Sequence, residues 1–200
     1  MRFCDDLGAA GFGWEAQEFL RRTSHALAHD GGVWLLDPVD APQALARAER
    51  LGDVRAVVQL IDRHDRDCAA LAARLAVPHL EVPFDGVPGS PFEVVRIADR
   101  PFWHEVALWW PERRVLVCGD ALGTVGYFLA PGDRLGVHPL LRLTPPRVLA
   151  TLEPEHVLVG HGAGVHGPDA AAAVERAVAT ARRRIPGAFL HGFRQLLRHG

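Results

Sequence analysis

The sequence predicts a mixed α/β fold in which β-sheets lie inside and helices cover them. Short apolar runs alternate with segments of helical periodicity, and Pro and Gly separate them at regular intervals. Three strand-like runs also follow one another closely in the middle of the chain, which indicates an antiparallel segment beside the alternating one. The length of 200 residues and the 48% hydrophobic content predict one globular domain over residues 1–200.

The first half of the chain predicts a hairpin followed by alternating helices and strands. The apolar runs at 24–28 and 33–36 flank the polar turn His29-Asp30-Gly31-Gly32, which is typical of a β-hairpin. Good helix formers at helical spacing predict a helix over 41–51, and a compact apolar run predicts a buried strand over 54–61. The remaining elements of this half are a helix over 69–75 and a short strand over 79–82.

The second half begins with the antiparallel segment. Strands are predicted over 92–97, 105–110 and 114–118, with a tight turn at Pro111-Glu112-Arg113 between the last two. The elements that follow are a short helix over 146–152, a strand over 157–159 and a long Ala- and Arg-rich helix from Asp169 to about residue 184.

Acidic and histidine residues recur just after the predicted strands. They are Asp37, His64, Asp120 and His161. Because α/β proteins place their chemistry at the carboxyl ends of strands, this recurrence predicts a functional site that these strand ends share. Two imidazoles and a carboxylate from three strand ends are a suitable ligand set for zinc, iron or manganese.

Four segments, in order, resemble the metallo-β-lactamase fold superfamily. Residues 57–67 are similar to the strand and loop that carry its His-x-His-x-Asp-His motif. Residues 115–122 resemble its later strand ending in Gly-Asp, where the Asp bridges two metals. Residues 157–162 resemble its last motif, where a His after a Gly binds the second metal, and the hairpin ending at Asp37 resembles its opening hairpin. The match in order and spacing covers residues 24–182 and implies an αββα sandwich.

The same resemblance shows where this chain departs from the family pattern. If His64 occupies the second His position of the first motif, Asp62, Arg66 and Asp67 occupy the positions of its first His, its Asp and its third His. Pro101 then falls at the position of the family's middle metal-binding His, and Pro has no side-chain ligand atom. We therefore expect an altered metal site.

The expected metal ligands are His64, Asp120 and His161, with His104 or Asp67 as a fourth. The fixed positive charge of Arg66 disfavours two adjacent dications, so we expect one divalent ion, zinc first and iron or manganese as alternatives, or none. Arg66 could instead pair with Asp62, Asp65 or Asp67 and act only as a structural link.

The resemblance implies a metal-dependent hydrolase acting on an ester, thioester or phosphoester through a water that the metal activates. Asp62 or Asp67 is the expected proton acceptor in this reaction. The alternative is a non-catalytic member of the fold that serves as a binding or dimerisation module, because most ligands of the first motif are replaced. An iron protein with redox or oxygen chemistry is a third hypothesis.

Composition excludes several other classes. The formal net charge of −2 includes no basic excess that would attract nucleic acid or an anionic membrane. Three cysteines without a spaced framework, an acidic N-terminus and the lack of an apolar run of ~18 residues predict a cytoplasmic protein. We expect a small-molecule substrate. The closely spaced Trp103, Trp109 and Trp110 are compatible with a homodimer interface.

Overall fold

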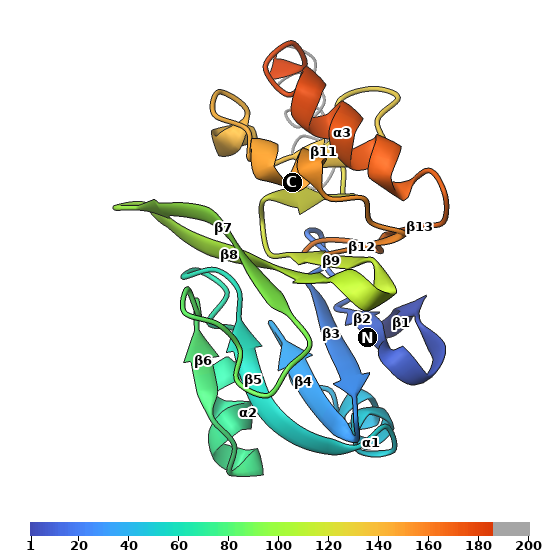
Figure 1. The fold of residues 1–200 in the computed structure, drawn as a ribbon, viewed down its shortest axis with the longest axis vertical. Coiled ribbons are helices and arrows are strands. Elements are labelled where there is room, and N and C mark those ends of the chain that lie inside the picture. Colours follow the sequence, from blue (N-terminus) through green and yellow to red (C-terminus); the bar gives the residue numbers. More distant parts are fainter. Residues whose placement is uncertain (186–200) are drawn as a thin grey trace.

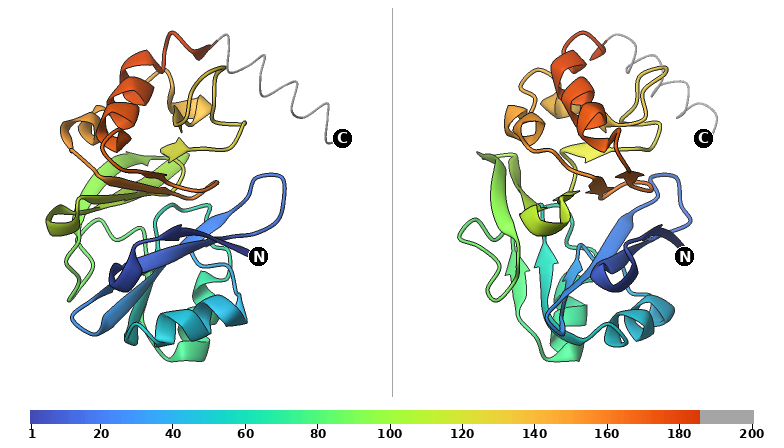
Figure 2. Two further views of the ribbon diagram at one scale, coloured as in Figure 1. Left: turned by 90° about the vertical axis from the view of Figure 1, so that its right-hand side faces the viewer. Right: turned by 45° about the vertical axis from the view of Figure 1, so that its right-hand side comes forward.

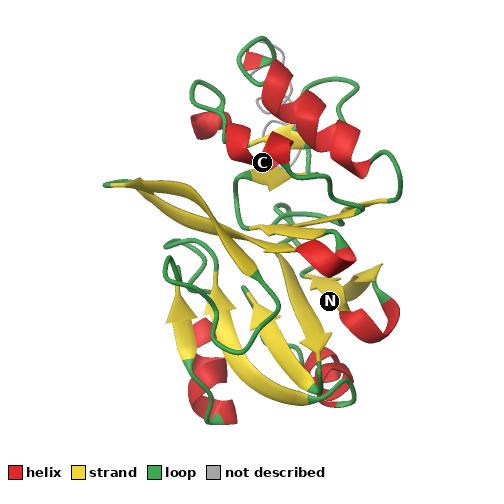
Figure 3. Ribbon diagram, in the orientation of Figure 1, coloured by secondary structure: helices red, strands yellow, loops and turns green. Residues whose placement is uncertain are grey.

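Two β-sheets pack face to face, and helices cover both outer faces. The computed structural model describes residues 1–185. Figure 1 shows the two sheets across the middle of the molecule, with α1 and α2 at one end and α3 at the other, and Figure 3 distinguishes helices from strands. The side views in Figure 2 show the same helix–sheet–sheet–helix layering. The architecture agrees with the sandwich that the sequence predicts.

The first sheet has six strands in chain order, and the helices α1 (Pro42–Glu49) and α2 (Cys68–Leu75) cover it. β3 and β4 form the antiparallel hairpin, whereas β4, β5 and β6 run parallel to one another. The strands are β1 Arg2–Asp6, β2 Gly11–Glu15, β3 Thr23–His29, β4 Gly32–Leu36, β5 Asp53–Gln59 and β6 His79–Glu81.

The second sheet has five strands in the order β13-β12-β9-β8-β7, and α3 (Ala170–Thr180) lies over its outer face. β9 and β12 are parallel, and the other neighbours are antiparallel. A two-stranded ribbon of β10 and β11 lies between this sheet and α3. The strands are β7 Glu93–Arg100, β8 Trp103–Trp110, β9 Val115–Cys118, β10 Leu122–Gly123, β11 Gly136–Val137, β12 His156–Val159 and β13 Val165–His166.

Alternate residues of the central strands pack into different layers. Along β4, Leu36 packs between the sheets and Leu35 packs on the side of α1 and α2. Along β12, Leu158 packs between the sheets, whereas Val157 and Val159 pack on the side of α3. Successive side chains of a strand point to opposite faces, so both faces of each sheet are buried here. This explains why the strands are continuous apolar runs, each residue of which stabilises the fold by roughly 1.5–3 kcal/mol when fully buried.

Most predicted elements are present within two or three residues of their expected bounds. The predicted helix over 146–152 is a 3-10 helix, η4 (Arg147–Thr151), because Pro145 and Pro146 precede a segment too short for a stable α-helix. The prediction missed the hairpin of β1 and β2 and the short strands β10, β11 and β13. The other 3-10 helices are η1 Gly8–Ala10, η2 Pro111–Arg113 and η3 Pro139–Leu141.

Two further findings concern the tryptophans and the membrane. Trp110 is buried between the sheets, and the half-buried Trp109 packs on the side of α3, so the two rings face opposite sides of β8. Within residues 1–185, no helix is both long and apolar enough to cross a bilayer.

Candidate metal centre

Three strands deliver the candidate ligands to one point between the sheets. β9 and β12 are parallel neighbours in which Cys118 pairs with Val159. Asp120 and His161 each follow two residues later, so they leave the sheet side by side. β5 of the other sheet ends close to them, because Ile61 makes an isolated bridge to Glu105 on β8, and His64 lies in the loop that follows.

Glycine precedes His161 because the ends of β9 and β12 approach each other too closely for a side chain at residue 160. A Cβ atom on Gly160 would lie 2.6 Å from the carbonyl oxygen of Gly119 and 2.8 Å from Cε1 of His64. The amide of Gly160 donates to the same Gly119 carbonyl at 3.0 Å. The glycine before His161 therefore reflects the close packing that brings the ligands together.

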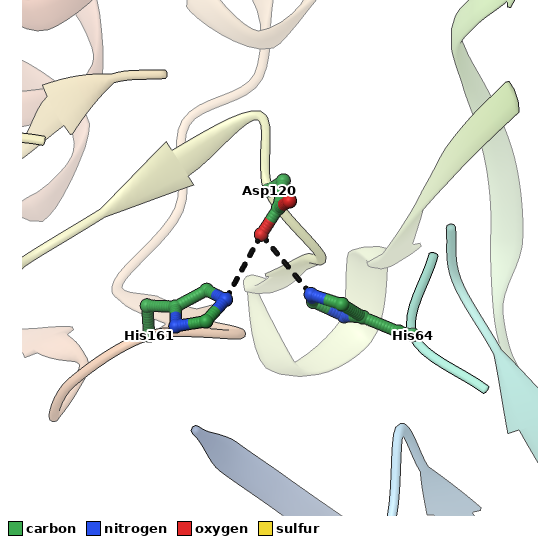
Figure 4. Close-up of side chains that lie close together, drawn as sticks. All are labelled: His64, Asp120 and His161. Atoms are coloured by element: carbon green, nitrogen blue, oxygen red, sulfur yellow. Dashed lines mark ion pairs between the residues drawn. The ribbon is translucent and has the colours of Figure 1, made fainter. Parts of the chain in front are cut away.

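The side chains of His64, Asp120 and His161 converge on one carboxylate oxygen. Nε2 of each imidazole lies 3.1 Å from Oδ1 of Asp120 (Figure 4). All three residues are buried, with 4–7% of their surface exposed. Among residues 1–185, these three form the one group of three or more His, Cys, Asp or Glu side chains whose ligand atoms all lie within 4.8 Å of one another.

Nδ1 of each imidazole has its own hydrogen-bond partner, and this partner determines whether Nε2 of the neutral ring carries a proton. Nδ1 of His161 lies 2.9 Å from the carbonyl oxygen of Leu20, and Nδ1 of His64 lies 2.8 Å from Oδ2 of Asp37. A carbonyl or a carboxylate only accepts, so both Nδ1 atoms carry the proton and a neutral ring presents its Nε2 lone pair to Asp120. This is the outer-shell arrangement typical of metal-binding histidines.

The electrostatics of this group would suit a bound cation. Oδ1 of Asp120 is buried and has no aligned hydrogen-bond donor among the described residues. Burial opposes the charge of this carboxyl, yet His161 and His64 hold its pKa well below the usual range. Burial and Arg66 oppose protonation of His64, but Asp37 and Asp120 outweigh them and raise its pKa.

Arg66 lies against this centre and links three strand ends. Its guanidinium donates to the carbonyl oxygens of Thr23 at 2.6 Å, Asp37 at 2.8 Å and Gly160 at 3.0 Å. Nη2 also lies 3.4 Å from Nε2 of His64. The alternative in which this side chain pairs with Asp62, Asp65 or Asp67 is not what the structure shows: backbone carbonyls, which the loop sequence does not reveal, hold the guanidinium instead.

The structure does not bring His104, Asp62 or Asp67 into the group. Nδ1 of His104 pairs with Asp99 at 2.9 Å on the exposed β7–β8 hairpin. Asp62 lies 3.6 Å from Arg63, and Asp67 accepts the amide of Asp40 at 2.7 Å. No hydrogen bond or ion pair joins these three side chains to the ligands.

Sequence reasoning missed the role of Glu105, a fully buried carboxylate directly behind Asp120. It accepts the amides of Asp120 at 2.8 Å and Ala121 at 2.7 Å, and the indole N–H of Trp103 at 2.6 Å. Burial and the charge of Asp120 raise the pKa of Glu105 to about 8. The sequence signal for this role was an acidic residue, Glu105, at the start of the otherwise apolar strand predicted over 105–110.

An open pocket of about 540 Å³ leads from the surface to the three ligands. Its rim includes both apolar and charged side chains. The residues around it are Glu18, Phe19, Leu20, Arg22, Arg63, His64, Asp120 and His161. A bound ion would therefore keep at least one position facing a space that water or a substrate can enter.

Solved structures of metallo-β-lactamases match this chain over most of its length. A metallo-β-lactamase from Erythrobacter litoralis gives a TM-score of 0.61 at 12% identity, covering 92% of this chain and 95% of that one. One from Pontibacter korlensis gives 0.59 at 10% identity, covering 89% and 99%. The DIM-1 metallo-β-lactamase gives 0.58 at 12% identity, covering 90% and 97%. The chain has the metallo-β-lactamase fold.

At these identities the similarity establishes the fold alone. No protein-family profile matches the sequence, and a comparison with curated proteins finds no match. The metallo-β-lactamase fold implies a metal, and the residues present can hold one. Three buried ligand atoms converge, the outer acceptors of both rings favour the tautomer that leaves Nε2 free, and no aligned donor among the described residues reaches Oδ1 of Asp120.

Proposed function

We propose that this protein is a hydrolase that binds one divalent ion, zinc first, through His64, Asp120 and His161. The observation that carries the proposal is the convergence of both Nε2 atoms on Oδ1 of Asp120 at 3.1 Å, with each Nδ1 held by an outer acceptor. The proposed substrates are esters, thioesters or phosphoesters. A bound ion would supply Lewis-acid chemistry and a water that ionises near neutral pH.

The buried charges favour one ion over two. Three buried carboxylates, Asp37, Asp120 and Glu105, surround the centre, and the guanidinium of Arg66 is the permanent cation against it. The excess is one or two negative charges, depending on whether Glu105 is ionised. One dication balances this excess, whereas two dications would leave uncompensated positive charge in a buried place beside Arg66.

The chain's own groups prepare the site for a substrate. Asp37 and the Leu20 carbonyl orient the two rings, and Arg66 holds the strand ends that carry them. At the pocket rim, Arg63 provides a positive charge for a developing anion, as a residue that stabilises negative charge in the transition state would.

The contacts of Asp62 and Asp67 bear on which of the two carboxylates is the better candidate for the proton acceptor. Oδ1 of Asp62 lies 3.6 Å from Nε of Arg63 and has no hydrogen-bond donor among the described residues, and Oδ2 accepts the amide of His104 at a long 3.4 Å. Asp67 accepts the amide of Asp40 at the shorter distance of 2.7 Å. Of the two residues that the sequence suggests, Asp62 is therefore the better candidate. We assign it no proton transfer, because no contact joins it to the three ligands.

Calorimetric titration with zinc tests the proposal. We expect one zinc ion per chain, and we expect Asp120→Ala and His161→Ala to abolish binding. His104→Ala is the matched control, because it removes an exposed imidazole that pairs with Asp99 and should leave the stoichiometry unchanged. Zinc-dependent hydrolysis in a screen of generic ester and phosphoester substrates would then support the reaction class.

The rival function is a metal-free binding module, and Arg66 is the observation that favours it. A guanidinium 3.4 Å from Nε2 of His64 supplies part of the positive charge that a metal would bring. This function predicts that purified protein contains no metal, binds none in the titration and has a melting temperature that a chelator does not change. One zinc bound per chain, with a chelator-sensitive melting temperature, would reject it.

A further inference from the structure

Glu105 is a buried carboxylate for which the described residues provide no ion-pair partner. It is 0% exposed, and its three donors are two backbone amides and one indole. Burying an ionised carboxylate is costly unless its hydrogen bonds are complete, so such residues persist where their contacts matter. Both amides belong to the turn that carries Asp120.

The strand register explains why a side chain, and not a neighbouring strand, accepts the amides of Asp120 and Ala121. β8 and β9 are antiparallel, and Leu108 pairs with Val117. Continued by three residues on each strand, this register would place Glu105 opposite Asp120. The ladder ends before that point, because β9 turns away after Cys118. The carboxylate of Glu105 therefore receives the amides of Asp120 and Ala121 that have no partner strand.

The backbone of Glu105 contacts the other ligand-bearing segment. At this residue β8 leaves β9 and bridges to Ile61 after β5. The amide of Val106 donates to Leu60 at 2.9 Å, and the amide of Asp62 donates to His104 at 3.0 Å. Glu105 therefore lies between the segment that leads to His64 and the turn that carries Asp120.

The residues around Glu105 pack closely against its carboxylate. A Cβ on Gly119 would lie 3.2 Å from Oε1 of Glu105 and 3.1 Å from Cγ2 of Ile61. On the other side, the indole of Trp103 that donates to Oε2 lies beneath the guanidinium of Arg63, 4.3 Å from the ring centre. A continuous set of contacts thus connects the pocket rim to the Asp120 turn.

We propose that Glu105 is a positioning residue for the metal centre, which holds the Asp120 turn so that Oδ1 faces both Nε2 atoms. Once a bound dication favours its ionised form, Glu105 also adds negative charge behind Asp120. The inference rests on the proposed function, because it assigns the contacts of Glu105 a role in metal binding beyond folding. Loss of an outer-shell partner of this kind weakens metal binding by roughly 10- to 100-fold.

The test is Glu105→Gln, measured as zinc affinity by competition with a chromophoric chelator. Glutamine retains an oxygen acceptor and the side-chain shape but removes the charge. We expect zinc affinity to fall by about 10- to 100-fold with the stoichiometry still one. We also expect the visible absorption of the cobalt-substituted protein to shift, because the carboxylate of Asp120 would be misaligned. The control is Glu112→Gln, an exposed glutamate on η2, which removes the same charge and should change neither quantity.

A second variant separates the charge from the hydrogen bond. In Glu105→Gln the amide NH₂ of the glutamine faces the indole N–H of Trp103, so two donors oppose each other. The double variant Glu105→Gln/Trp103→Phe removes this conflict. The double variant should recover a native-like cobalt spectrum while its zinc affinity stays weakened. Trp103→Phe alone removes one of the three donors and should weaken zinc binding, but less than Glu105→Gln does. If the glutamine variants do not fold, a Trp103→Phe variant with wild-type zinc affinity overturns the inference.

The outcomes distinguish this inference from the proposed function. If wild-type protein binds no metal, both are wrong. If the wild type binds zinc and Glu105→Gln binds it within about threefold of the wild type, with an unchanged cobalt spectrum, Glu105 is only a structural residue. The melting temperature of the metal-free variants is recorded as well, because a role limited to folding would lower it without changing the affinity of the folded protein.

Discussion

Acidification should destabilise the fold through His138, a buried histidine that packs among aromatic side chains. Its ring packs edge-on against Trp103, Tyr127 and Phe128 at centroid distances of 4.7–5.4 Å, and it is 6% exposed. Its Nδ1 accepts the amide of Leu140 at 3.2 Å, which requires that this nitrogen carry no proton. Burial lowers the pKa of His138 from 6.5 to about 4.

The expected size of this effect follows from the two pKa values. As the pH falls, the unfolded chain takes up the proton first, so stability is complete above pH 6.5 and is lost progressively toward about pH 4. The loss between about pH 7.5 and about pH 5 is roughly 2 kcal/mol, and its limit is roughly 3 kcal/mol, since one pKa unit corresponds to 1.36 kcal/mol.

The assay is urea unfolding of the chelator-treated wild type and of His138→Asn at both pH values. Asparagine does not titrate, and it can accept the Leu140 amide as a cap of η3 (Pro139–Leu141). The variant will be less stable at both pH values because it leaves space among the aromatic rings. Only the difference in pH dependence counts, and other titrating groups cancel in it. If wild type and variant lose the same free energy on acidification, the reasoning is wrong.

Three further predictions concern residues that hold the centre together. Asp37→Ala removes the acceptor of His64 Nδ1 and should weaken zinc binding by about 10- to 100-fold by calorimetry, whereas the surface variant Asp40→Ala should not. Arg66→Met removes three charge-assisted hydrogen bonds and should lower the free energy of unfolding in urea by about 4 kcal/mol. The control Arg55→Met, at an exposed position, should lower it by less than about 1 kcal/mol, and equal losses would contradict this account. Gly160→Ala places a Cβ 2.6 Å from the Gly119 carbonyl and should destabilise by about 1–3 kcal/mol, so an unchanged stability would show that the two strand ends can separate freely.

Apolar periodicity and turn chemistry made the central strands and helices predictable from the sequence. The elements that were missed lack these signals. β1 (Arg2–Asp6) contains three charged residues out of five, and its form depends on pairing with β2. β10, β11 and β13 are two residues long, so tertiary contacts alone define them. Local patterns cannot reveal such elements.

The convergence of His64, Asp120 and His161 was predictable because each follows a strand, and the parallel strands β9 and β12 end at the same edge of their sheet. The surrounding residues were not, because their roles depend on contacts between distant segments. His104 has the right chemistry, but it lies on the β7–β8 hairpin and pairs with Asp99 across it. Glu105, the next residue, faces inward because side chains alternate along β8, so one step along the strand separates an exposed imidazole from a buried carboxylate.

Anomalous diffraction at the zinc edge from crystals soaked in zinc tests the central claim most directly. We expect one peak at roughly 2 Å from Nε2 of His64, Nε2 of His161 and Oδ1 of Asp120. The pair formed by His156 and His166, whose Nδ1 atoms are 3.0 Å apart on β12 and β13, provides an internal comparison. A peak at that pair with none at Asp120, or two peaks beside Arg66, would contradict the single-metal centre.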